Sequence, residues 1–266
     1  MPNFSANLTL LFNELPFLDR FEAAAAAGFK AVEFYFPYDY RHTDLRRLLR
    51  DNGLKLVVHS LPSGDWAKGE RGIACQIGSM SSVRASRAAS TMPVHWSVHA
   101  AGIRSPAFPV DEPFRVLTDN LCFAAEQLAE AGLELVVEQV NSRDVPGFLL
   151  DRPETALAIV REVGAPNVKL QYDVYQAQVL AGDLTRFVEA HIDHIGHIQI
   201  ADNPGRHEPG TGEINYDFFL RRIAEIGYSG WVGCEYVPLS TTTAGLDWLR
   251  RTTAHLNTPA LFGGSK

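Results

Sequence analysis

The chain has 266 residues, of which 46% are apolar, so it is long enough to bury the core of one large domain. Its formal net charge is −7, and its Lys and Arg residues are scattered, which argues against a nucleic-acid-binding protein because phosphate binding requires a basic face. Three cysteines without zinc-site spacing argue against a disulfide-stabilised protein and favour a reducing compartment.

The opening segment, FSANLTLLF, lacks the basic stretch and cleavage site of a signal peptide. No later stretch reaches the roughly 20 apolar residues that a membrane-spanning helix needs. We therefore expect a cytoplasmic protein without a membrane partner. A homo-oligomer is compatible with the sequence, which does not determine the oligomeric state.

Short apolar runs alternate with longer amphipathic stretches, which is typical of repeated strand–helix units and a parallel sheet. In the first part of the chain the predicted strands are FSANLTLL, AVEFYF and KLVVHSL. One helix is predicted over FLDRFEAAAAAGF, ended by Gly28. A second is predicted from Thr43 as N-cap to Asn52, ended by Gly53.

The same alternation continues after a disturbed stretch over residues 77–101. Further strands are predicted at LELVVEQ, VKLQYDV, HIGHIQIAD and WVGCEY, and further helices over 113–131, 153–163, 184–193, 217–226 and AGLDWLRRTTAHL.

Seven strand–helix units can be recognised, and an eighth would fall in the disturbed stretch. Eight units in about 250 residues fit an α/β fold of the (β/α)8 TIM-barrel type. We predict a single TIM-barrel domain over residues 1–256 and a C-terminal tail over 257–266. A doubly wound open sheet is the alternative, but no G-x-G-x-x-G motif follows the first strand.

Four polar residues stand at the downstream ends of predicted strands: Glu138, Asp173, Gln199 and Glu235. The carboxyl ends of the strands of such a barrel meet at one face, where the chemistry takes place. Three carboxylates and one amide offer oxygen ligands that suit a hard divalent cation, and a shared cation would explain carboxylates next to buried residues. The alternative is that each residue marks the point where its strand emerges into solvent.

Two predicted loops at the same face carry candidate substrate ligands. In NPGRHEPGTGEINYDFF, Arg206 offers a planar fork for a carboxylate or hydroxyls, although an ordinary loop with a solvated Arg gives the same pattern. LPSGDWAKGERGIAC is long enough to form a lid or an irregular surface excursion. His59, just before it, can hydrogen-bond a substrate oxygen or serve a structural role.

Several segments taken together resemble the hydroxypyruvate isomerase family: FSANLTLLF, VEFYFPYDY, LPSGDWAKGERGIAC, LQYDVY, HIQIADNPGR, EPGTGEINYDF and WVGCEY. The wider relatives are the xylose-isomerase-like barrels, with close cousins that act on 2-oxo-tetronates. The resemblance covers roughly residues 1–75 and 110–250. It implies a metal-dependent isomerase that interconverts hydroxypyruvate and tartronate semialdehyde through an enediolate.

The resemblance also implies roles for the four strand-end residues. Glu138, Asp173, Gln199 and Glu235 would hold one Mg2+ or Mn2+ ion, and Glu138 and Glu235 would be the catalytic acid/base pair. Which glutamate acts as the base is left open.

The expected partner is a small hydroxy-keto acid, whose carboxylate or hydroxyls Arg206 and His59 would bind. The related barrels often carry a His three residues after the Asp of the sixth strand, whereas this chain has Gln176, which forms hydrogen bonds but cannot carry a charge. Substrate preference can therefore differ. A 2-oxo-tetronate isomerase and a ketose 3-epimerase on the same site are the alternative enzymes.

Residues 77–101 do not fit the family, because they contain no acidic residue and have weak apolar periodicity. One hypothesis is a local frameshift in the gene, since permissible codons for Ser79 to His99 can encode the amphipathic helix HEFRASVARGIDYARAL in another frame. Gene sequences of close relatives test it, because the hypothesis requires a pair of compensating insertions or deletions. The alternative is a genuine divergent insert.

This stretch should supply the third helix and the fourth strand. We expect the helix to be irregular, and the strand, PVHWSVHA, to be weak or missing because two histidines are unusual in a buried barrel strand. Loss of a strand would expose two sheet edges. A catalytically impaired barrel is therefore a third hypothesis.

Overall fold

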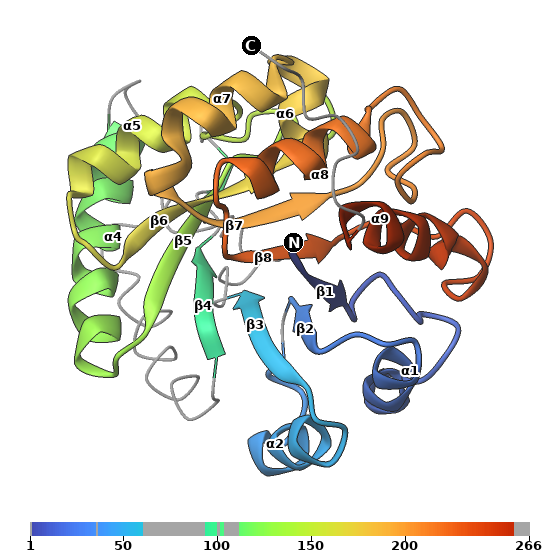
Figure 1. The fold of residues 1–266 in the computed structure, drawn as a ribbon. Helices are drawn as coiled ribbons and strands as arrows, with labels where there is room; N and C mark the ends of the chain where they lie inside the picture. Colours follow the sequence, from blue (N-terminus) through green and yellow to red (C-terminus); the bar gives the residue numbers. More distant parts are fainter. Residues whose placement is uncertain (1, 36, 61–93, 100–101, 104–111, 258–266) are drawn as a thin grey trace.

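A computed structural model of the chain describes residues 2–35, 37–60, 94–99, 102–103 and 112–257. Parallel strands form a closed barrel in which each strand pairs with the next in the sequence and the last pairs with the first (Figure 1). The strands are β1 (Asn3–Asn7), β2 (Ala31–Phe34), β3 (Lys55–Ser60), β4 (Val94–His99), β5 (Glu134–Glu138), β6 (Val168–Asp173), β7 (Ile195–Ile200) and β8 (Trp231–Cys234). The predicted (β/α)8 barrel is confirmed.

The helices lie around the outside of the barrel (Figure 1). They are α1 (Arg20–Ala26), α2 (His42–Asp51), α4 (Glu112–Glu130), α5 (Pro153–Val163), α6 (Val174–Leu180), α7 (Leu184–His191), α8 (Tyr216–Glu225) and α9 (Asp247–Asn257). In the part of the chain that the structure describes, short 3-10 helices precede α1, follow α7 and precede α9: η1 (Phe17–Asp19), η4 (Ile192–His194) and η5 (Ala244–Leu246). Among the described residues, no helix is both long and apolar enough to cross a membrane.

The hydrophobic core has two parts that follow from the alternation of side chains along each strand. On β5, Leu135 and Val137 face outward into the large core that the barrel shares with its helices. Val136 faces the barrel interior, where it joins a small apolar cluster with Ala31 and Val57. Toward the carboxyl ends of the strands, the inward-facing positions are polar, and the candidate site is built there.

Several element boundaries differ from the sequence-based predictions. The first strand ends at Asn7, because the LTLL segment turns into a loop in which Phe12 has a positive φ of 57°. Helix α2 begins at His42 with Arg41 at the N-cap position, so the predicted Thr43 cap is wrong. Gly28 and Gly53 do follow α1 and α2 with positive φ values, as predicted for helix ends.

Strand β4 is present, so the expectation of a weak or missing fourth strand is wrong for the described backbone. Val94–His99 pairs in parallel with β3 on one side and with β5 on the other, and the barrel is closed. Backbone hydrogen bonding requires no particular side chain, which is how an unusual sequence can occupy this position. The predicted irregular third helix, over 77–93, lies outside the described residues.

The predicted domain boundary falls at the end of the last helix. Helix α9 runs to Asn257, and the rest of the predicted tail, residues 258–266, lies outside the part of the chain that the structure describes.

Candidate active site

Three carboxylates converge at the carboxyl ends of the strands. Glu138 is the last residue of β5, Asp173 is the last residue of β6, and Glu235 directly follows β8. One oxygen atom from each lies within 4.8 Å of the others. Asp173 and Glu235 are buried and Glu138 is partly buried, so the cluster lies at the mouth of the barrel and not on its outer surface.

The amide of Gln199 links this cluster to the interior of the barrel. Gln199 is in register with Asp173 on the neighbouring strand. Its Nε2 donates a hydrogen bond of 3.1 Å to Glu235 Oε1, and its Oε1 accepts one of 2.6 Å from Gln171 Nε2. The structure therefore brings together all four strand-end residues that the sequence singled out.

Asp173 is held by the start of the helix that follows it. Its Oδ1 accepts hydrogen bonds from the backbone N–H groups of Tyr175 and Gln176, at 2.8 and 3.2 Å, so Asp173 is the N-cap of α6. Because Oδ1 is committed to the cap, Oδ2 is the oxygen that faces Arg206, at 3.5 Å from its Nη2.

Arg206 supplies the positive charge at the cluster. Its Nη2 lies 2.5 Å from Glu235 Oε2, and its guanidinium stands over the ring of Tyr175 with Cζ 5.4 Å from the ring centroid. The loop after β7 turns sharply here, since Arg206 has a φ of 56°. Its buried Nε has no hydrogen-bond partner among the described residues, so this donor is available to a ligand.

The electrostatic environment disfavours ionisation of two of the carboxyl groups, those of Glu138 and Asp173. Burial, together with the neighbouring Glu235 and Asp173, raises the pKa of Glu138 well above its usual range. Burial raises the pKa of Asp173 to about 8, with Glu235 adding to the shift and Arg206 opposing it. Carboxyl groups in such an environment can accept and release protons near neutral pH.

Tyr35, which directly follows β2, is a site residue that the sequence analysis missed. Burial and the carboxylate of Glu235, with which its hydroxyl is hydrogen-bonded, raise the pKa of Tyr35 well above its usual range. The hydroxyl therefore stays protonated and acts as a donor to Glu235. The apolar run AVEFYF gave no signal, because aromatic residues are common in buried strands.

A second group of polar residues, also missed, lies inside the barrel below the cluster. The buried carboxylate of Glu33 accepts hydrogen bonds from Ser5 Oγ at 2.8 Å, Asn7 Nδ2 at 3.2 Å, His197 Nε2 at 2.9 Å and Gln199 Nε2 at 2.8 Å. Burial alone would raise the pKa of Glu33, but His197 and the hydrogen bonds outweigh it and lower the pKa. The available sequence signal was a polar residue inside an apolar strand segment.

Gln176 lies beside the cluster, but its side chain holds a neighbouring loop. Its Oε1 accepts hydrogen bonds from the backbone N–H of Asn141, at 2.9 Å, and from Asn141 Nδ2, at 2.5 Å. Asn141 also contacts Asp144. Gln176 thus lies near the predicted substrate site, and its side-chain oxygen holds the loop after β5 in place.

The structure does not bring His59 to the cluster. A register shift in the pairing of β2 with β3 sets His59 beside Phe34, which packs outward against Phe17 and Phe21. Its ring lies near Tyr38 instead, and burial lowers the pKa of His59 to about 4. The lid predicted directly after it, over 61–75, lies outside the described residues.

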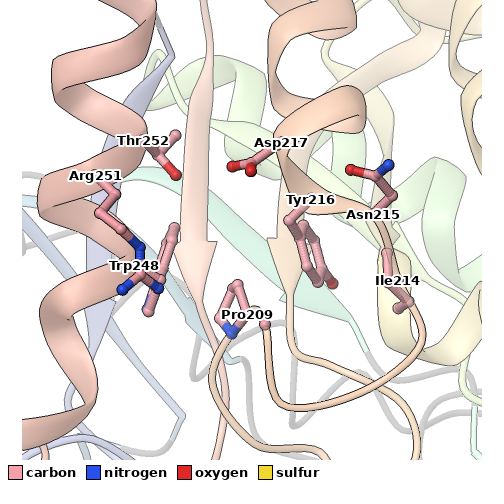
Figure 2. A pocket seen from close by; sticks show the side chains of 9 residues that line it. Pro209, Ile214, Asn215, Tyr216, Asp217, Trp248, Arg251 and Thr252 are labelled. Carbon is pink, nitrogen blue, oxygen red and sulfur yellow. The ribbon is translucent and has the colours of Figure 1, made fainter.

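A separate cavity of about 150 Å³ lies between the helices, away from the carboxylates. Figure 2 shows Trp248 of α9 and Tyr216 of α8 on opposite sides of it, with Pro209 of the loop after β7 at one end. None of the predicted site residues lines this cavity, so the candidate site is the carboxylate cluster.

The donor atoms of the cluster fit a hard divalent cation. Three buried or partly buried carboxylates approach one another more closely than their charges favour, and Arg206 offers only one compensating charge. Oxygen ligands of this kind suit Mg2+ or Mn2+ and do not suit a soft metal.

Comparison with known proteins gives the same fold and a consistent group of relatives. The family described as xylose isomerase-like TIM barrel matches residues 21–252. The chain is 45% identical over 257 residues to hydroxypyruvate isomerase of Escherichia coli (strain K12), covering 94% of this chain and 98% of the relative. It is 44% identical over 255 residues to 2-oxo-tetronate isomerase of Cupriavidus necator, with the same coverage of both chains.

Solved structures show the same likeness. A Brucella melitensis protein described as AP endonuclease, family 2, matches with a TM-score of 0.89 and 40% identity, covering 94% of this chain and 99% of that one. 3-Keto-D-glucoside 4-epimerase of E. coli matches with a TM-score of 0.76 but only 18% identity, which shows a shared fold alone.

Proposed function

Because this chain belongs to the xylose isomerase-like TIM barrel family and is an isomerase, we propose that it interconverts hydroxypyruvate and tartronate semialdehyde. Glu138 and Glu235 are the proposed acid/base pair. The observation that carries the proposal is the convergence of three carboxylate oxygens within 4.8 Å beside Arg206.

The reaction moves a hydrogen between two neighbouring carbons and needs no oxidant or reductant. One glutamate removes a proton from C3 of hydroxypyruvate, and the electron pair forms the C2–C3 double bond of an enediolate. A proton is then added at C2, while the hydrogen on O3 is lost and O2 gains one. The raised pKa of Glu138 suits these transfers, because this carboxyl group can hold a proton near neutral pH.

Arg206 is the proposed ligand of the substrate carboxylate. Its guanidinium already contacts two carboxylates, and its Nε–H is free of partners among the described residues. A planar guanidinium binds a carboxylate through two parallel hydrogen bonds, which fixes the orientation of the neighbouring C2 and C3 atoms.

A divalent cation, Mg2+ or Mn2+, is part of the proposal. Glu138, Asp173, Gln199 and Glu235 would hold it. When bound, such a cation supplies positive charge that lowers the energy of negative charge on a substrate oxygen. For Gln199 the ligand atom would be its amide oxygen.

A second candidate substrate is a 2-oxo-tetronate, which has one more carbon atom. The identity to a 2-oxo-tetronate isomerase, 44%, is almost the same as the identity to a hydroxypyruvate isomerase, 45%. Both substrates are 2-oxo acids with a hydroxyl on C3, so the same glutamates and the same Arg206 would serve either one. The net charge of −7 disfavours a nucleic-acid substrate.

The test is an isomerase assay on hydroxypyruvate and a 2-oxo-tetronate with Glu138→Gln and Glu235→Gln. Each variant should lose about 10²- to 10⁴-fold in kcat, because an amide of the same shape cannot exchange a proton. The ratio of kcat/KM between the two substrates identifies the preferred one.

Glu134→Gln is the matched control, since Glu134 lies on the same strand as Glu138 but at its opposite end. This variant should keep the activity of the natural protein. An unchanged rate in Glu138→Gln or Glu235→Gln would refute the acid/base assignment.

A further inference from the structure

Among the described residues, four side chains donate hydrogen bonds to the carboxylate of Glu33. Glu33 is 1% exposed, and its two oxygens receive hydrogen bonds from β1 on one side and β7 on the other. A carboxylate has about four acceptor positions, and the four side-chain donors fill them. Glu33 is not part of the carboxylate cluster and has no part in the proposed reaction.

Two of the four donors continue to Glu235. Asn7 Nδ2 lies 3.2 Å from Glu33 Oε1 and 3.3 Å from Glu235 Oε1. Gln199 Nε2 lies 2.8 Å from the same oxygen of Glu33 and 3.1 Å from the same oxygen of Glu235. Each amide nitrogen has two hydrogens, so each can donate one to Glu33 and the other to Glu235.

The barrel is shaped to hold the Glu33 carboxylate in this position. Gly233 on β8 faces it, and a Cβ atom there would lie 2.4 Å from Glu33 Oε2 and 2.5 Å from Oε1. No side chain larger than hydrogen fits at that position without displacing the carboxylate. Gly233 lies on β8 and Glu235 directly follows that strand, so the same segment makes room for Glu33 and carries the glutamate that it influences.

We propose that Glu33 is a positioning residue, which orients the Asn7 and Gln199 amides so that both donate to Glu235 and thereby sets the affinity of the site for its divalent cation. The inference rests on the proposed function. It adds to that function a residue that touches neither the cation nor the substrate.

Glu33 can orient the two amides because its carboxylate only accepts hydrogen bonds. Glu33 accepts at both oxygens, so the amides of Asn7 and Gln199 must present nitrogen to it. In Glu33→Gln, the new NH2 group would face other donors, and one or both amides would rotate. Glu235 would then lose hydrogen bonds that fix its orientation. The amide oxygen of Gln199, which is the proposed cation ligand, would also leave its present position.

The experiment measures the dissociation constant of Mn2+ by electron paramagnetic resonance titration of the full chain. Glu33→Gln should weaken Mn2+ binding about 10- to 100-fold, the usual effect of removing a residue that supports a metal ligand. In a Glu235→Gln background the same substitution should weaken binding less than about 3-fold, because the residue through which Glu33 acts has already changed.

Tyr228→Phe is the control for general loss of stability. It removes a partly buried hydrogen bond of 2.9 Å to the Trp231 carbonyl and a longer one of 3.4 Å to the Gly196 carbonyl, and neither bond involves Glu33 or Glu235. It should leave Mn2+ affinity unchanged. Equal weakening of Mn2+ binding by Tyr228→Phe and Glu33→Gln would overturn the proposal, because a purely structural effect would explain both.

Asn7→Ala replaces Glu33→Gln if that variant does not fold. It deletes one of the two bridges, and about 3- to 10-fold weaker binding is expected, again with little further loss in the Glu235→Gln background. Unchanged Mn2+ affinity, or losses that multiply fully with that of Glu235→Gln, would overturn the positioning role. If the natural protein binds no Mn2+, the proposed metal-dependent function fails as well, which separates that failure from one confined to Glu33.

Discussion

At the scale of single residues, the cluster uses the two oxygens of a carboxylate for different purposes. In Asp173, Oδ1 accepts hydrogen bonds from the N-terminal turn of α6, and Oδ2 faces Arg206. In Glu235, Oε1 accepts hydrogen bonds from the amides of Asn7 and Gln199, and Oε2 pairs with the same arginine. In both cases structural hydrogen bonds occupy one oxygen and thereby aim the other at the mouth of the barrel.

Arg206→Met tests the proposed carboxylate ligand. The substitution removes the fork and the charge, so kcat/KM for hydroxypyruvate should fall about 10- to 100-fold, mainly through a higher KM, since a charged hydrogen bond contributes about 1.5–3 kcal/mol. Arg206→Lys should recover part of the loss because it restores charge without the bidentate geometry. Steady-state kinetics measure both effects.

Arg222→Met serves as the control for Arg206. Arg222 lies on the outer side of α8, where it pairs with Glu189 and Glu225. Its replacement should leave KM unchanged. A normal KM in Arg206→Met would show that this arginine does not bind the substrate.

Some site residues were predictable from the sequence, and others were not. Glu138, Asp173 and Glu235 follow apolar strand segments, and the barrel geometry then forces their side chains together. Glu33 lies within such a segment, where its chemistry is hidden by its neighbours. His59 was predicted near the substrate, but a register shift between β2 and β3 directs it away from the cluster. Such a shift cannot be recognised from the amino-acid sequence of the two strands.

At the scale of elements, the loop between β7 and α8 depends on one buried carboxylate. Asp202 accepts hydrogen bonds from the backbone N–H groups of Asn203, Gly210 and Ile214, at 3.0, 2.8 and 3.1 Å. The loop folds back on itself, since the Glu213 N–H donates a hydrogen bond of 2.8 Å to the Asn203 carbonyl. Asp202 thus joins parts of the loop that are distant in sequence. Arg206 lies within this loop, and its position follows from the loop's shape.

Asp202→Ala should therefore affect stability and substrate binding together. Losing three hydrogen bonds at a buried position should lower the free energy of unfolding by about 3 kcal/mol. KM should rise as well, because the loop no longer holds Arg206 in place. Chemical denaturation and steady-state kinetics on the same preparation provide the two measurements.

Asp217→Ala is the control in the same region, since Asp217 is exposed in the first turn of α8. Its effect on the free energy of unfolding should stay within about 0.5 kcal/mol. If Asp202→Ala destabilises the protein and leaves KM unchanged, the loop does not control the position of Arg206.

The order and type of the elements were largely predictable, because the alternation of apolar runs and amphipathic stretches is strong. Helix α5 has the predicted bounds, Pro153–Val163. Helix α6 was missed because it starts directly after β6, with Asp173 serving as both strand end and helix cap. The apolar run before Asp173 indicated the end of a strand, and it gave no sign that the same residue also begins a helix.

At the scale of the whole molecule, closure of the barrel determines whether the site exists. The structure closes through β4 although its sequence is unusual for a buried strand. This weakens the hypothesis of an open, impaired barrel. The frameshift hypothesis for 77–101 remains a prediction, because residues 77–93 and 100–101 lie outside the described residues.

Removal of divalent cations should make stability depend on pH. The pKa of Asp173 is raised from 3.8 to about 8 in the folded protein. Between these values the folded state keeps a proton that the unfolded chain has lost, so raising the pH lowers the free energy of unfolding. The raised pKa of Glu138 acts in the same direction.

In the presence of a chelator, the melting temperature should therefore fall between pH 6 and pH 8. Added Mn2+ should raise it more at pH 8, because the cation binds ionised carboxylates. Asp173→Asn is the control variant and should flatten the dependence in the chelated protein. An equal slope in both proteins would contradict the assignment of the effect to Asp173.

The pairing of β8 with β1 joins the last strand of the barrel to the first, and it places Asn7 beside Glu235. During translation these two residues are made at different times, because Asn7 precedes Glu235 by 228 residues. The nascent chain thus carries three of the proposed ligands, Glu138, Asp173 and Gln199, before the fourth, Glu235, is made. The proposed cation site can therefore be completed only after synthesis has passed Glu235, which directly follows β8.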